Sequence, residues 1–393
     1  MNDIKISTVE FEKRIDKFKS IMREDKVDAL FVYGDEYRKE NLRYVSNYWP
    51  LFERGALICG INSFPTVLCA PEGELVAKEM SVWPDVRVVP DFLCVTVFDT
   101  IEYPQATYTS FYALAEELRR QGPLKRLGLV GADAMSAVLM ETIKKSFMCD
   151  IVDYNPNIAK FRLIKSRDEI ACLRKAAQIA EIGFRAMMDS NLIGKTERWA
   201  AGVAEGAARQ AGAEAVIFTV LGSGERSAKI ISRPDNKLIE DGDMLMCALA
   251  IQYEGYVATS EIPFAVGNYS EQTRKVIDCL IQAGAAGLPF LKPGQPMMNY
   301  VSAVRNYFRN AGVSQYDLYP PLHGIGCAEA ESPYPNENTE AVFEIGMTVS
   351  TDISLFGLPG GSNRVEEAFV ITEDGAESLS PFLRSYFNNW TMR

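Results

Sequence analysis

The chain of 393 residues contains a single histidine, His323. Because imidazole has an unperturbed pKa near neutrality, His323 is the side chain best suited to general acid–base chemistry. One histidine also excludes mechanisms that need a histidine pair and metal sites built on three histidines. A catalytic site at His323 must therefore be completed by other residue types.

Carboxylates in or beside strand-like apolar runs can complete such a site, and Glu261, Asp352 and Glu366 are three of them. Asp352 lies in an apolar run, and burying a lone carboxylate is costly unless it faces a polar pocket or pairs with a cation. Arg364 is the alternative partner for Asp352, and a place at the surface is the alternative for Glu261 and Glu366. If the three acids share one cavity, their repulsion raises some pKa values unless a cation enters. We therefore expect a ligand with a guanidinium, amidinium or ammonium group.

The first half of the chain is expected to form an α/β domain. Apolar residues recur at helical spacing over 11–22, and a further helix is expected near 110–121. These helices alternate with short apolar runs that predict buried strands. The runs lie at 29–33, 55–61, 66–69 and 126–132. The polar segment 154–157 predicts a turn and a boundary, which divides the chain into domains 1–157 and 158–393.

The second half is expected to mix helices and strands in an α+β manner. A long helix opens at Ser166, and its apolar positions keep a clean helical period. Further elements follow after residue 215. Strand-like runs lie at 244–251, 262–266, 348–353 and 367–371, and helices near 271–288 and 297–311. Glu261, Asp352 and Glu366 therefore lie in or next to expected strands.

Charge and cysteine usage exclude several classes of function. The formal net charge is −11, so neither nucleic acid nor an anionic membrane is expected as a partner. Neither a signal peptide nor a stretch of 18 apolar residues is visible. The eight cysteines form no C-x-x-C pair and are scattered through apolar stretches. This pattern predicts buried thiols in a reducing, cytoplasmic compartment.

Five phrases of the second half, taken together, resemble the creatinase/aminopeptidase P family (M24). They occur in family order over about residues 160–393. The phrases are FRLIKSRDEIACLRKAA (161–177), GDMLMCALAIQYEGYVATSEIPFAVG (242–267), HGIGCAEAESPY (323–334), GMTVSTDI (346–353) and NRVEEAFVITEDG (363–375). The first half resembles the family's N-terminal domain more loosely, by its size and by LRYVSNYWP (42–50). The resemblance implies an α/β N-terminal domain, an α+β "pita-bread" C-terminal catalytic domain and a homodimer.

Active members of that family hold two metal ions with two aspartates, a histidine and two further carboxylates. The matching positions here are Ala248, Thr259, His323, Asp352 and Glu366. Two divalent cations a few ångströms apart need several carboxylates to offset their repulsion, and alanine offers no donor. The resemblance thus implies a dismantled two-metal site. We expect no metal and no other cofactor; a single ion, if bound, would use His323, Asp352 and Glu366.

Creatinase is the metal-free branch of the family, and it carries a G-Y-x-x-x-x-E phrase. The segment 255–261 reproduces that spacing and ends at Glu261. The comparison implies that Glu261 and Asp352 hold a cationic group. It also implies that His323 activates water or protonates the leaving nitrogen, while Glu366 orients His323 or acts as a second acid or base.

Two departures from creatinase argue against creatine itself as the substrate. The shuttle histidine upstream of Gly-Asp has no counterpart near Ile231 and Ser232, and a later family histidine is Ala330. The resemblance also implies other substrate contacts. Aromatic residues of the first half are included because creatinase closes its pocket with an aromatic residue from the neighbouring subunit. The expected substrate-binding residues are Glu331, Arg364, Tyr256, Tyr48, Trp49 and Phe52.

The favoured function is a metal-independent hydrolase that breaks a C–N bond in a small, polar, cationic substrate, as creatinase does. Two other functions stay open. One is an atypical M24 peptidase that cleaves Xaa-Pro or N-terminal peptide bonds with at most one metal ion. The other is a pseudo-peptidase that has lost catalysis and serves as a binding module. Metal content and a screen of guanidino compounds and dipeptides distinguish the three.

Overall fold

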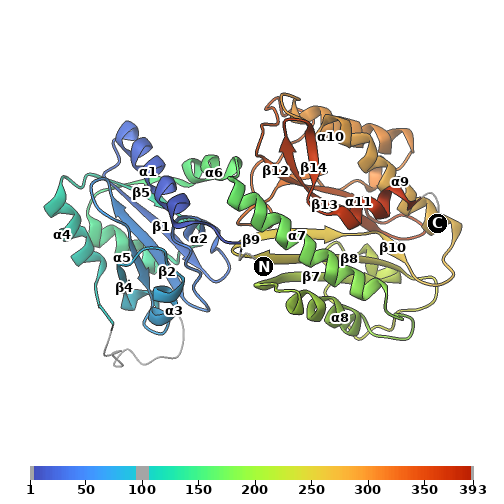
Figure 1. Ribbon diagram of the computed structural model, residues 1–393, viewed down its shortest axis with the longest axis horizontal. Helices are drawn as coiled ribbons and strands as arrows, with labels where there is room; N and C mark the ends of the chain where they lie inside the picture. Colours follow the sequence, from blue (N-terminus) through green and yellow to red (C-terminus); the bar gives the residue numbers. More distant parts are fainter. Residues whose placement is uncertain (1–3, 94–105, 391–393) are drawn as a thin grey trace. The chain divides into compact units, whose positions relative to one another are not determined.

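A computed structural model describes residues 4–93 and 106–390 of the chain. The chain divides into two compact units, one formed by Ile6–Phe161 and the other containing Arg162–Arg393 (Figure 1). The predicted α/β and α+β classes of the two halves are confirmed. No helix among the described residues is both long and apolar enough to cross a membrane. Of the eight cysteines, Cys94 lies outside the described residues, and five of the other seven are buried.

The first unit is a six-stranded sheet in the order β4-β3-β2-β1-β5-β6. Its central strand β1 pairs antiparallel with β2 and parallel with β5, and aromatic side chains fill the core against it. The strands are β1 (Ala29–Asp35), β2 (Arg54–Gly60), β3 (Thr66–Cys69), β4 (Val86–Val88), β5 (Arg126–Val130) and β6 (Asp150–Asp153). The helices are α1 (Thr8–Asp25), α2 (Glu40–Ser46), α3 (Glu74–Met80), α4 (Phe111–Gln121), α5 (Ala137–Phe147) and α6 (Asn155–Leu163).

The segment 154–157 does not form the turn expected from its composition. Asn155 is the first residue of α6, and Pro156 follows it in the first helical turn. Proline is tolerated there because the first N–H groups of a helix have no intrahelical partner. A polar Asn-Pro-Asn sequence therefore begins a helix here.

The second unit is an eight-stranded sheet covered by helices. Six strands follow the order β10-β8-β9-β13-β12-β11, while β7 pairs with β8 and β14 with β13. The strands are β7 (Ala215–Ser223), β8 (Met244–Tyr253), β9 (Tyr256–Glu261), β10 (Phe264–Ala265), β11 (Leu322–Gly324), β12 (Thr348–Leu355), β13 (Asn363–Thr372) and β14 (Gly375–Ser378). The helices are α7 (Arg167–Met188), α8 (Glu197–Gln210), α9 (Glu271–Gly287), α10 (Met297–Asn310) and α11 (Pro381–Asn388). Helix α7 begins at Arg167, and Ser166, which was predicted to open it, is its N-cap residue and forms a complete capping box with Glu169.

Strand alternation separates a core face from a polar face in this sheet. Successive side chains of a strand point to opposite faces, so residues two apart share a face. On β12, Val349 and Ile353 belong to the hydrophobic core, and on β13 so do Val365 and Phe369. Asp352 directly precedes the core residue Ile353, so its side chain points to the opposite, polar face. Arg364 and Glu366 alternate with the core positions of β13 in the same way.

Strand register then aligns four of the candidate positions in one row. Ala248 on β8 pairs with Glu261 on β9, Glu261 pairs with Glu366 on β13, and Glu366 pairs with Asp352 on β12. The turn that joins β8 to β9 fixes part of this register. Its two central residues, Glu254 and Gly255, have φ values of 48° and 82°, as a tight hairpin turn requires.

Candidate active site

The polar face of the second sheet forms the floor of a cavity of about 810 Å³. This volume is in the range of sites for small organic ligands. The walls are mainly apolar, and charged side chains gather at the base. Apolar lining residues are Phe218, Val220, Ile231, Pro234, Tyr319, Pro320, Leu322 and Tyr334. Charged residues that line it are Arg233, His323, Glu329, Asp352 and Arg364.

His323 lies on β11 and is buried at the base of this cavity. Its Nδ1 is 3.0 Å from the carbonyl oxygen of Gly324, and its Nε2 is 3.3 Å from Oε1 of Glu366. Burial by itself would lower the pKa of His323, but the hydrogen bond and charge of Glu366, with Glu329 nearby, raise it to about 9. The two acids therefore favour the protonated, cationic form of His323.

Glu329 is a member of the site that the sequence did not single out. Its Oε1 lies 4.0 Å from Nε2 of His323 and accepts a hydrogen bond of 3.3 Å from the hydroxyl of Thr259. Thr259 stands where the family resemblance places a metal-binding aspartate, so this hydrogen bond brings Glu329 beside that position. Among the described residues, ligand atoms of His323, Glu329 and Glu366 all lie within 4.8 Å of one another. The expected single-ion set named Asp352 as the third member, and the structure groups Glu329 there instead.

Asp352 and Glu261 face Arg364. Nε of Arg364 is 3.1 Å from Oδ1 of Asp352 and 3.7 Å from Oε2 of Glu261. Burial raises the pKa of Asp352, against the opposing effect of Arg364 and His323. Burial also raises the pKa of Glu261, to about 8, although Arg364 acts in the other direction. The two carboxylates expected to hold a ligand cation therefore already have a cation from the chain itself.

Glu366 and its neighbour Glu367 point to opposite sides of β13. Burial raises the pKa of Glu366 to about 7, while the hydrogen bond to His323 acts to lower it. Glu367 accepts a hydrogen bond of 2.6 Å from Ser378 and pairs with Arg384 at 2.6 Å, both away from the cavity. Of this acidic pair, only Glu366 contacts His323.

Two expected substrate-binding residues of the second unit are engaged elsewhere. The buried carboxylate of Glu331 pairs with Arg162 and, at 2.8 Å, with Lys165. Two cations fully compensate one acid, so they hold the pKa of Glu331 below its usual range despite burial. The hydroxyl of Tyr256 donates a hydrogen bond of 2.9 Å to Glu169 of α7. The structure brings neither side chain to the cavity.

The three aromatic candidates of the first unit differ in exposure. Tyr48 is buried, and Trp49 is half-buried with its indole N–H donating to the carbonyl of Glu36 at 3.2 Å. Phe52 is 50 % exposed and has a φ of 44°, which is unusual for a bulky residue. Their expected contact with a neighbouring subunit's substrate stays a prediction.

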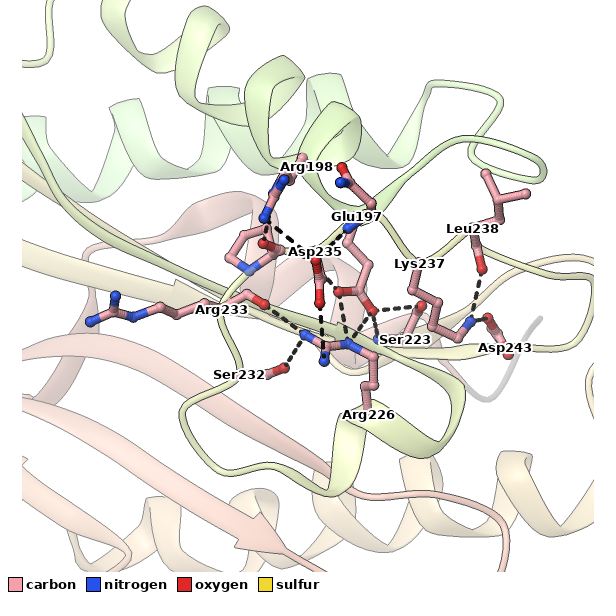
Figure 2. Close-up of polar contacts among 12 residues, drawn as sticks. Glu197, Arg198, Ser223, Arg226, Ser232, Arg233, Asp235, Lys237, Leu238 and Asp243 are labelled. Carbon is pink, nitrogen blue, oxygen red and sulfur yellow. Dashed lines mark hydrogen bonds and ion pairs between the residues drawn. The ribbon is translucent and has the colours of Figure 1, made fainter.

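One wall of the cavity is the segment that connects β7 to β8. The buried side chain of Glu197 stabilises this segment by hydrogen bonds. Glu197, at the start of α8, is fully buried and accepts hydrogen bonds from Ser223, from Nε of Arg226 and from the backbone N–H of Asp235. Arg226 in turn donates to the hydroxyl of Ser232 at 3.2 Å and to the carbonyl of Arg233 at 2.7 Å. Figure 2 shows this network, with the guanidinium of Arg233 extending away from it. The hydrogen bonds of Glu197 and Arg226 thus fix the backbone of the cavity wall, and the Arg233 side chain lies outside this network.

Comparison with known proteins gives the family. The model of metallopeptidase family M24 matches residues 171–373, and that of the Creatinase/Prolidase N-terminal domain matches residues 14–164. The chain belongs to metallopeptidase family M24, a family of hydrolases that act on C–N bonds. The pita-bread catalytic domain and the creatinase-type N-terminal domain expected from the sequence are confirmed.

Similar proteins carry peptidase names. The chain is 26% identical over 372 residues to the Xaa-Pro dipeptidase of Pyrococcus furiosus, covering 94% of this chain and 98% of that one. It is 30% identical over 232 residues to the uncharacterized peptidase YqhT of Bacillus subtilis, covering 59% and 66%. The solved prolidase of Pyrococcus horikoshii OT3 has a TM-score of 0.78 at 24% identity, covering 94% and 98%. X-Pro aminopeptidase of Thermotoga maritima MSB8 has a TM-score of 0.79 at 22% identity, covering 93% and 97%.

These findings correct the expected placement in the creatinase branch. The named relatives are Xaa-Pro dipeptidases, so neither a creatinase-like nor a metal-independent enzyme is supported. The G-Y-x-x-x-x-E spacing that suggested creatinase does place Glu261 beside the cavity floor. There, however, it faces Arg364.

The residues present do not fit two metal ions but do fit one. Ala248 ends the row of site positions with a methyl group, and the hydroxyl of Thr259 is engaged with Glu329. His323, Glu329 and Glu366 supply an imidazole nitrogen and two carboxylates within one small volume. Such a donor set suits a divalent ion that accepts mixed nitrogen and oxygen ligands.

Proposed function

We propose that the protein is an atypical M24 peptidase that cleaves the peptide bond of Xaa-Pro dipeptides or similar short peptides with one metal ion. His323, Glu329 and Glu366 would hold that ion. The observation that carries the proposal is the convergence of these three donors at the base of a large cavity, in a chain whose named relatives are Xaa-Pro dipeptidases.

The charges at the cavity floor support a single ion. Four carboxylates meet there, from Glu261, Glu329, Asp352 and Glu366, and the described cationic side chains among them are His323 and Arg364. His323 must be neutral to bind the ion, so Arg364 and one divalent ion together would balance three of the four carboxylates. The fourth, Glu261, has a pKa of about 8 and is mostly protonated at neutral pH. Arg233 is counted apart because it is exposed, where solvent and salt screen its charge.

A bound ion would supply Lewis acidity toward the scissile carbonyl group. The chain's own residues would position the peptide around it. The apolar walls suit an aliphatic side chain and a proline ring. Glu329, the most exposed of the three proposed ligands at 25 %, faces the cavity and can also accept a substrate ammonium group. The carbonyl oxygen of Gly324, 3.0 Å from Nδ1 of His323, orients the imidazole so that Nε2 faces Glu366 and Glu329.

The test is metal content followed by peptide hydrolysis. Purified protein is loaded with Mn²⁺ or Zn²⁺, and Ala-Pro, Leu-Pro and Gly-Leu are offered as substrates. The proposal predicts bound metal and release of proline, with both lost in His323→Ala. Full occupancy by neither metal, together with no cleavage of any dipeptide, would overturn it. Turnover of guanidino compounds by the metal-free protein would return the function to the creatinase type.

A further inference from the structure

The segment between β7 and β8 brings one charged side chain, that of Arg233, to the wall of the cavity. The backbone there is held on both sides. The carbonyl oxygen of Ser232 accepts a hydrogen bond of 2.9 Å from the N–H of Leu221, and that of Arg233 accepts one of 2.7 Å from Arg226. Pro234 follows, and a proline restricts the residue before it to an extended backbone. The backbone of Arg233 is therefore fixed in the wall before any ligand binds.

The guanidinium of Arg233 takes no part in these contacts and extends away from the neighbouring hydrogen-bond network (Figure 2). Within the part of the chain that the structure describes, it has no ion pair and no hydrogen bond. The other two basic side chains that line the cavity face acids. His323 lies 3.3 Å from Glu366, and Arg364 lies 3.1 Å from Asp352. Of these three described side chains, Arg233 is the one whose charge is available to a ligand.

The surroundings of Arg233 differ from those of the cavity floor. The floor holds the acids, which would repel an anionic group of a ligand. The wall around Arg233 is apolar, with Ile231 and Pro234 on its own segment and Phe218 on β7. Apolar surroundings strengthen an ion pair relative to one in open water. Arg233 itself is exposed, so an ion pair formed there remains sensitive to salt.

We propose that Arg233 binds the terminal carboxylate of the peptide and so selects short peptides with a free C-terminus. A guanidinium offers paired N–H donors that match the two oxygens of a carboxylate. The inference rests on the proposed function in taking a peptide as the substrate, and it adds the end group that the site requires. A peptide amide lacks the negative charge and should bind less tightly.

The test compares Leu-Pro with Leu-Pro amide, which has the same side chains and ammonium group but no carboxylate. Initial rates are measured with the Mn²⁺-loaded full chain. The wild type is expected to have a KM for Leu-Pro about tenfold lower than that for the amide. In Arg233→Met, which keeps apolar bulk and loses the charge, the two KM values should agree within about twofold. The difference should lie in KM, because a carboxylate that does not react is bound alike in the ground state and the transition state.

Lys229→Met is the matched control. Lys229 is exposed on the same segment and is not among the described residues that line the cavity. Its loss also removes one positive charge from this segment, so the ratio of the two KM values should stay that of the wild type. Arg233→Lys keeps the charge and should keep a preference for Leu-Pro. Raising NaCl from about 0.05 M to about 0.5 M should narrow the wild-type preference and leave the ratio in Arg233→Met unaffected.

Calorimetry on EDTA-treated protein separates this inference from the proposed function. Arg233 is present without metal, so the wild type should bind Leu-Pro more tightly than the amide. That result without cleavage of any peptide would refute the proposed function and leave the assignment of Arg233 standing. Equal binding of the two peptides by the wild type, binding of neither, or a preference that survives in Arg233→Met overturns the inference. Circular dichroism shows whether each variant is folded, and the wild-type comparison and its salt dependence need no variant.

Discussion

Replacing Glu197 with alanine is expected to destabilise the second unit and loosen the cavity wall. Its fully buried carboxylate accepts from the Ser223 backbone N–H at 2.8 Å and hydroxyl at 2.9 Å, from Nε of Arg226 at 3.0 Å and from the Asp235 N–H at 3.0 Å. Removing one partner of a buried ion pair costs about 3–5 kcal/mol. Arg226 is 21 % exposed, so water partly solvates the abandoned guanidinium and the loss should be near 3 kcal/mol.

The assay is equilibrium unfolding in urea with tryptophan fluorescence that reports on one unit. Trp49 and Trp83 lie in the first unit, so their replacement by phenylalanine leaves Trp199 and Trp390 as reporters of the second. This separation is needed because two units need not unfold together. Glu225→Ala is the control, since Glu225 is exposed on the same connection and its loss should cost within about 0.5 kcal/mol. A loss below about 1 kcal/mol for Glu197→Ala would refute the assignment of Glu197 as the anchor of this wall.

Two further predictions concern the acids of the site. Because burial raises the pKa of Glu261 from 4.5 to about 8, folding favours its protonated form, and that contribution to stability is present below pH 4.5 and lost as the pH rises toward 8. Thermal unfolding of the metal-free protein should show that Glu261→Gln becomes more stable relative to the wild type as the pH rises from 4.5 to 8, with no further gain above pH 8. A difference in stability that does not depend on pH would contradict the raised pKa. Glu329→Gln should weaken Mn²⁺ binding by at least about tenfold, and Asp352→Asn by less, since Asp352 faces Arg364. The reverse order in a Mn²⁺ titration would restore Asp352 as the ligand.

Sequence periodicity predicted much of the frame that carries the site. Alternation in the apolar runs around Asp352 and Glu366 reflects a sheet with one core face, and the two residues are cross-strand partners in the structure. The phrases that resemble the family placed these two strands in order along the chain. The sequence analysis missed helix α6 because its first turn is Asn-Pro-Asn. This composition is common both in loops and at helix N-termini.

The partners of the charged residues could not be predicted in the same way. Glu329 lies outside the strands, and its contact with Thr259 depends on the path of a loop that sequence periodicity does not predict. The pairing of Arg364 with both Asp352 and Glu261 depends on three strands and two rings meeting at one point. A spacing of seven residues that matched creatinase therefore said where Glu261 lies but not which cation it faces.

The stoichiometry of Mn²⁺ binding to the wild-type chain tests the central claim most directly. Calorimetric titration, checked by elemental analysis after gel filtration, is predicted to give one ion per chain, and His323→Ala is predicted to abolish it. Two ions per chain would contradict the account, and so would one ion that survives the loss of His323.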